Sequence, residues 1–168
     1  MMISAETVTQ TWQRMAQTPV PELPDLIEQM GAEQPVIAAY LLAAKGLPFN
    51  RNEFELVFYI GMVVWQIMKQ SERPLRKVTR KKLRQAEEAN EDLFDRLGPG
   101  TGTEPARLTQ LLAFKYPEPE VLRYIVEAIV EELESDETPI RDEYKGLAFV
   151  YLRTALDAFV ASLAPHRR

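Results

Sequence analysis

The order of apolar and polar positions predicts an all-α chain. Apolar residues recur at intervals of three and four through most of the sequence, and no two alternating segments joined by a short turn indicate a β-hairpin. The most apolar segment is 54–68, of which 56–68 carry no charge. A helix that is apolar on nearly every side lies in the core of a globular domain, and about 20 such residues would be needed to span a bilayer. We therefore expect 54–68 to be the central core helix.

Local signals predict where several helices begin and end. Ser4 is expected to cap a first helix that runs to Gln17, and Asn50 with Glu53 forms a capping-box pattern ahead of the central helix. Gly31 is placed where a left-handed C-terminal cap would end a short helix. The residues expected on one face of the first helix are Val8, Trp12 and Met15.

The second half of the chain continues the helical pattern. We expect one charged helix over 75–97, a glycine-rich linker at 98–102, a short helix over 105–114 and a helix over 119–133. A last helix is expected to start at Thr138-Pro139 and to carry its apolar residues along one face. The predicted architecture is a single-domain bundle of about eight helices covering 1–163, with a frayed tail at 164–168.

Two windows of the sequence resemble each other at an offset of 90 residues. Arg51-Asn52-Glu53-Phe54 matches Arg141-Asp142-Glu143-Tyr144, and each window opens a long apolar helix. One interpretation is a duplicated helical hairpin, with halves 1–70 and 103–163 joined by the charged helix and the linker. The other is coincidence, because helix starts favour Asn, Asp and Glu in any case.

The composition excludes several common kinds of catalytic site. The chain has no Cys and a single His, His166, in the predicted tail. Thiolate nucleophiles, Cys-ligated metals and His-dependent triads are therefore excluded, and we predict no catalytic residue, cofactor or metal ligand. The lack of Cys and of a secretory leader pattern favours a cytoplasmic protein that does not associate with membranes.

Charge is strongly segregated along the predicted helix 75–97. Residues 73–84 hold seven bases and no acid, and five acids follow in 87–95, although the net charge of the chain is −5. Bases at the start of a helix oppose the backbone dipole, at a cost of about 0.3–1 kcal/mol each, so an anionic group is expected to offset them. Pairs four residues apart, Arg84 with Glu88 and Asp92 with Arg96, would recover part of this cost. The candidate partner-binding residues are Arg76, Lys77, Arg80, Lys81, Lys82 and Arg84.

Three sources of that anionic group remain open. The acid-rich segment 118–143 can pair with the basic run within one chain or across a homodimer, a protein partner can supply acids, or a nucleic acid can supply phosphates. No aromatic residue lies between the bases and no nucleic-acid recognition motif accompanies them, so nucleic acid is the less favoured choice.

A further alternative is a magnesium-dependent phosphohydrolase. The fragments Glu88-Ala89-Asn90-Glu91 and Glu134-Ser135-Asp136-Glu137 resemble the Glu-x-x-Glu and Glu-x-x-Asp pairs with which all-α nucleotide pyrophosphohydrolases bind Mg²⁺. The second fragment departs from that pattern because it ends in Glu, and such spacing is common in acid-rich helices.

The function favoured by the sequence is that of a non-enzymatic helical interaction or scaffold module. It is expected to engage an unknown protein partner, or a second copy of itself, through its charge-segregated surface. Nucleic-acid association through 73–84 is the first alternative and the phosphohydrolase the second.

Overall fold

The computed structural model describes residues 2–97, 115–130 and 140–165, and within these ranges the only regular structure is helical. This confirms the predicted all-α bundle. The eight α-helices of the described ranges are α1 (Ala5–Ala16), α2 (Leu23–Glu33), α3 (Pro35–Leu42), α4 (Arg51–Met68), α5 (Arg80–Ala89), α6 (Glu91–Leu97), α8 (Pro119–Val130) and α9 (Asp142–Ala161), and the 3₁₀ turns are η1 (Val20–Glu22) and η2 (Ala43–Gly46).

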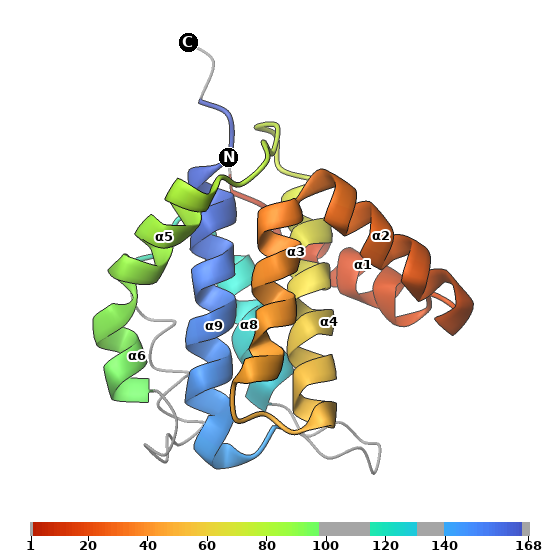
Figure 1. Ribbon diagram of the computed structural model, residues 1–168. Helices are drawn as coiled ribbons and strands as arrows, with labels where there is room; N and C mark the ends of the chain where they lie inside the picture. The colour runs from red at the N-terminus through yellow and green to blue at the C-terminus, as the bar shows by residue number, and fades with distance from the viewer. Residues whose placement is uncertain (1, 98–114, 131–139, 166–168) are drawn as a thin grey trace.

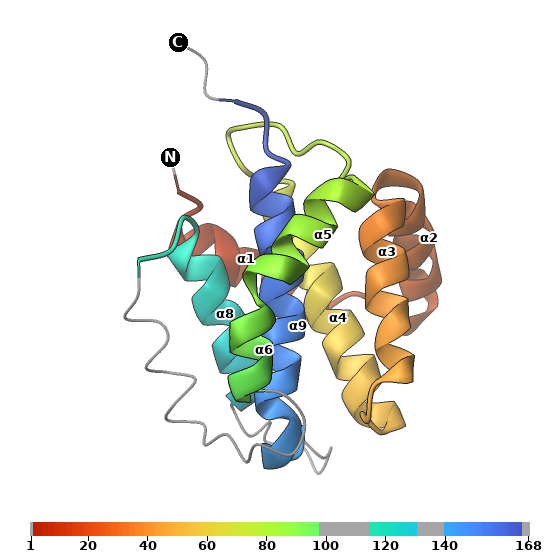
Figure 2. The same cartoon turned by 60° about the vertical axis from the view of Figure 1, so that its left-hand side comes forward.

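Two helices, α4 and α9, form the centre of the bundle (Figure 1). Most of the other helices pack on this pair: α8 packs on both, α5 and α6 follow one another along α9, and α1 and α3 pack on α4, whereas α2 packs on α3 (Figure 2). The sequence predicted α4 correctly as a core helix. It underestimated the burial of α9. This helix buries residues on most of its circumference, such as Leu147, Phe149 and Leu152, rather than along one face. The helices on both sides of α9 account for this burial.

The predicted capping box at the start of α4 is confirmed, and a glycine inside α4 lets a neighbouring helix approach closely. The Asn50 side chain accepts a hydrogen bond from the Glu53 amide, and the Glu53 carboxylate accepts one from the Asn50 amide, each at 2.8 Å. Gly61 permits α3 to pack tightly, because a Cβ atom at Gly61 would lie only 2.6 Å from Cδ1 of Leu41. The core therefore depends on a missing side chain at this crossing.

Two local predictions near the N-terminus are wrong. Ser4 does cap α1, but Trp12 is 39% exposed, whereas the neighbouring Thr11 is buried with Val8 and Met15. The 8–11–15 spacing is the face that packs on α4, and Trp12 lies about 100° away from Thr11 around the helix. Gly31 does not end a helix, because α2 continues through it to Glu33.

The single charged helix predicted over 75–97 is also wrong. Residues 74–79 are not helical and Leu75 forms a β-bridge, α5 starts at Arg80, and the helical path is interrupted at Asn90 before α6. Extended backbone at the start of this segment is fixed by pairing with the end of α9, which periodicity along the sequence cannot reveal.

Several predictions fall outside the described residues: the linker 98–102, the helix 105–114, the end of the helix predicted over 119–133, the start at Thr138-Pro139, and His166 in the tail. The proposed duplication stays a prediction. Within the described ranges, no helix has the length and apolar character needed to cross a membrane.

Candidate interaction site

The charged helices are anchored at their start by the segment 74–78, which crosses the C-terminal end of α9. Leu75 and Leu163 form an antiparallel bridge, in which the Arg76 amide donates to the Ser162 carbonyl at 3.0 Å and the Ala164 amide donates to the Pro74 carbonyl at 2.8 Å. These bonds satisfy backbone groups that would otherwise lack partners at the end of a helix. They also fix the direction in which the chain enters α5.

A buried glutamine holds the other side of this segment. Gln34, at the junction of α2 and α3, is 3% exposed. Its side-chain amide donates to the Arg76 carbonyl at 3.0 Å, and its side-chain oxygen accepts from the Val78 amide at 2.9 Å. Thr79 then caps α5 by accepting from the Lys82 amide at 3.2 Å. The start of α5 is therefore tied to both α3 and α9.

Two bases of the run have a structural role. Lys82 donates from Nζ to the Ala161 carbonyl at 2.7 Å, and a guanidinium nitrogen of Arg73 lies 3.4 Å from the Ala164 carbonyl. Both positive charges thus lie near the C-terminal end of α9, where the helix dipole favours cations. Lys82 belongs to the predicted partner-binding set, and this contact gives it a function within the fold.

The other five predicted residues are all exposed, and we call them together the basic surface. Its members are Arg76, Lys77, Arg80, Lys81 and Arg84. Among the described residues, none of the five forms an ion pair, and the expected pairs Arg84–Glu88 and Asp92–Arg96 are absent. No ion pair joins the basic run to the described part of 118–143 either. The charges of the basic surface are thus not offset by an ion pair within the part of the chain that the structure describes.

Asn90 fixes the junction between α5 and α6. It is 4% exposed, and its side-chain nitrogen donates to Thr154 Oγ1 at 3.3 Å and to Asp157 Oδ2 at 2.8 Å on α9. Asp157 also accepts a hydrogen bond from the Tyr116 hydroxyl. A buried side-chain amide needs such partners, and here they hold the bend against α9. Both ends of α5 are consequently anchored, while its outer face stays free.

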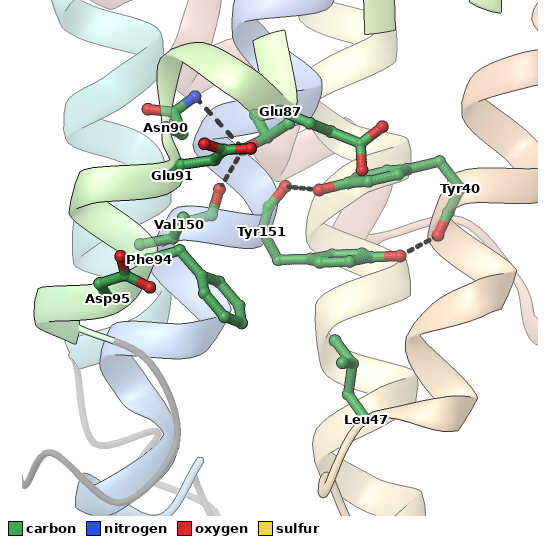
Figure 3. Close-up of a pocket in the computed structure, with 10 residues that line it drawn as sticks. Tyr40, Leu47, Glu87, Asn90, Glu91, Phe94, Asp95, Val150 and Tyr151 are labelled. Carbon is green, nitrogen blue, oxygen red and sulfur yellow. Dashed lines mark hydrogen bonds between the residues drawn. The ribbon is translucent and has the colours of Figure 1, made fainter. Parts of the chain in front are cut away.

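A pocket of about 560 Å³ lies beside the acidic half of α5–α6, between these helices and α3 (Figure 3). Glu87, Glu91 and Asp95 line it on one side, with the Phe94 ring next to them. Phe94 is 41% exposed, so the pocket is bordered by an accessible apolar side chain as well as by acids.

A reciprocal tyrosine pair forms the opposite wall. Tyr40 of α3 and Tyr151 of α9 stack with ring centroids 4.1 Å apart and planes 8° from parallel. The Tyr40 hydroxyl donates to the Tyr151 carbonyl at 2.9 Å, and the Tyr151 hydroxyl donates to the Tyr40 carbonyl (Figure 3). Burial, together with nearby Tyr151, raises the pKa of Tyr40, and burial with nearby Glu87 raises that of Tyr151. Both phenols therefore stay neutral, and the charge on this pocket is that of its carboxylates.

The alternative magnesium site is only partly described. Glu88 and Glu91 are both exposed, and Glu134 and Glu137 lie outside the described residues. Within the described ranges, no three residues among Asp, Glu and His are grouped so that they can hold a metal ion.

The sequence identified the charges of this site but missed the residues that position them. Gln34, Asn90 and Tyr151 act through contacts 42 to 111 residues away in sequence. The one usable signal was Asn90, a residue of low helix propensity within an otherwise helix-favouring stretch. A comparison with protein-family models, curated proteins and solved structures found no match to this chain.

Proposed function

We propose that this chain is a non-enzymatic protein-interaction module that engages a protein partner through the exposed charges of α5 and α6. One observation carries the proposal. The basic surface and the acids Glu87 and Glu91 are exposed and form no ion pair among the described residues. Bases in the first turn of a helix oppose the helix dipole, and here no ion pair with a described residue offsets their charge. Their presence therefore favours a function in binding a partner rather than in stabilising the fold.

The rigidity of the surface supports the same function. Gln34 and Thr79 fix the start of α5, and Asn90 fixes its end. The backbone of α5 is therefore already ordered before a partner binds. Less of the binding free energy is then lost to conformational entropy. We further propose that the partner is met in the cytoplasm, since a chain without Cys suits a reducing compartment.

The test is affinity capture from a native lysate, with half of the sample treated with nuclease. The charge-reversal variant is Arg80→Glu/Lys81→Glu/Arg84→Glu, which spares Lys82 because of its bond to α9. A protein captured stoichiometrically by wild type after nuclease treatment, and lost from the variant, supports the proposal. Equal capture by the variant refutes it.

Nucleic-acid association is the second candidate, favoured by the exposure of five bases within 76–84. It ranks lower because the acids of the same helix pair repel phosphates. It predicts affinity that falls with salt at a slope of about −0.9 per phosphate neutralised on duplex DNA. Loss of all captured material on nuclease treatment would support it against the first proposal.

A further inference from the structure

A four-residue charge stripe runs along α5 and the start of α6, and it consists of Arg80, Arg84, Glu87 and Glu91. Within α5, the spacing of four and three residues places Arg80, Arg84 and Glu87 on one helical face. Glu91 follows directly after the turn at Asn90, and all four residues are exposed. The adjacent stripe of Leu83, Ala86 and Asn90 faces the bundle, where α5 packs on α9. The charge stripe thus lies next to the buried face of α5, and its two acids border the pocket between α5–α6 and α3.

The order of charges along the stripe makes it complementary to itself. The two bases come first and the two acids follow. If a second α5 lies antiparallel, with a two-fold axis between Arg84 and Glu87, each Arg84 is opposite the Glu87 of the other copy. Each Arg80 is then opposite a Glu91, and the symmetry forms every pair twice. A parallel arrangement would instead place like charges together.

From this pattern we infer that the partner bound by α5 is a second copy of this chain, in an antiparallel, two-fold symmetric dimer. The inference rests on the proposed function and names the partner for the same surface. A uniformly acidic partner would leave Glu87 and Glu91 facing like charges, and a uniformly basic one would do so at Arg80 and Arg84. A second copy satisfies both halves of the stripe at once.

Phe94, at the border of the acidic pocket, supplies the apolar contact that such a dimer needs. Exposed ion pairs contribute little stability by themselves, so charge sets the orientation and apolar burial must add affinity. Phe94 lies beside the pocket one turn after the stripe, and it is 41% exposed. In the antiparallel arrangement the α6 end of one copy approaches the segment ahead of Arg80 in the other, where the exposed Lys77 can pack on the Phe94 ring.

The test is sedimentation of the full chain over a range of concentrations, at low and high salt. Two variants reverse one half of the stripe each: Arg80→Glu/Arg84→Glu makes it wholly acidic, and Glu87→Lys/Glu91→Lys makes it wholly basic. We expect the wild type to dimerise, each variant alone to dimerise at least about tenfold more weakly, and high salt to weaken the wild-type dimer. An equimolar mixture of the two variants should recover a heterodimer, and the fourfold variant should recover a homodimer.

Recovery in the mixture is decisive, because a variant that failed to fold would not be restored by another. A wild-type chain that stays monomeric at every concentration, or variants that dimerise unchanged, would overturn the inference. If the chain is monomeric and the charge-reversal variant still loses a captured protein, the dimer is refuted and the interaction module stands. If charge reversal affects neither self-association nor capture, both proposals fail.

Discussion

Glu53 and Arg141, 88 positions apart, join the starts of the two central helices. The Glu53 carboxylate is 1% exposed and accepts hydrogen bonds from the Arg141 amide at 2.8 Å and from its guanidinium at 2.8 Å. The same carboxylate closes the capping box of α4 through the Asn50 amide. One side chain therefore satisfies backbone donors at the N-terminal ends of both α4 and α9, and its charge is favoured by both helix dipoles.

Removal of the Arg141 side chain is expected to destabilise the fold. Arg141→Ala leaves a buried carboxylate with only amide donors, and we expect the free energy of unfolding to fall by more than it does when an exposed ion pair is removed. Arg51→Ala is the matched control, because it removes an exposed pair with Glu55 in the same helix. Urea denaturation should show a loss below about 0.5 kcal/mol for the control. Equal losses would contradict the assigned role of Glu53.

Glu53 should also make stability depend on pH. Burial raises the pKa of this carboxyl, but the hydrogen bonds from Arg141 and Asn50 outweigh burial, and the pKa lies below its ordinary value of 4.5. Because the native state binds this proton more weakly than the unfolded state, its contribution is complete above pH 4.5 and is lost as pH falls through the native pKa. Glu53→Gln should be less stable than wild type at neutral pH, with a smaller difference in acid. A difference in stability between wild type and variant that increases as the pH falls would contradict this assignment.

The reciprocal tyrosine bonds are expected to add measurable stability. Tyr40→Phe and Tyr151→Phe keep the stacked rings and remove one hydroxyl each, so we expect about 1 kcal/mol of destabilisation per variant. Tyr59→Phe is the control, because no hydrogen bond from its hydroxyl to a described residue is present. Thermal unfolding should place the control within about 0.5 kcal/mol of wild type. If all three variants behave alike, the paired bonds contribute nothing specific.

Two glycines should respond to alanine in opposite directions. Gly61→Ala places a Cβ against buried Leu41, and overpacking of this kind costs about 1–3 kcal/mol, more than the gain of about 1 kcal/mol from helix propensity. Gly31→Ala, inside α2 with no atom within 4 Å of the added Cβ, should stabilise by about 0.4–1 kcal/mol. Chemical denaturation of both variants tests this. Stabilisation by Gly61→Ala would show that α3 and α4 do not pack as described.

The features that sequence analysis predicted are those encoded locally. The capping box of Asn50 and Glu53 and the apolar run of α4 are determined within a few residues, and both are confirmed. The bond from Arg141 to the same Glu53 was hidden, because nothing in a local window shows which distant donor a carboxylate will meet. Resemblance of their two windows had suggested duplication, whereas the structure adds a direct contact between them.

In the candidate site too, the sequence showed the charged residues but not the contacts that position them. The bases of 73–84 were evident from the sequence, but only the structure shows that Lys82 contacts the end of α9 while Arg80 and Arg84 remain exposed. The break at Asn90 depends on acceptors supplied by α9, so the charged segment was mistaken for one continuous helix. Tertiary contacts here override the helical periodicity.

The most direct test of the central claim compares two triple variants of equal net charge. Arg80→Glu/Lys81→Glu/Arg84→Glu alters the proposed surface, and Arg14→Glu/Arg51→Glu/Lys115→Glu alters three exposed bases elsewhere. In nuclease-treated lysate, we predict that the control variant captures the wild-type partner, or a second copy of the chain, and that the surface variant captures neither. Equal capture by the two variants would contradict a role for α5 in binding.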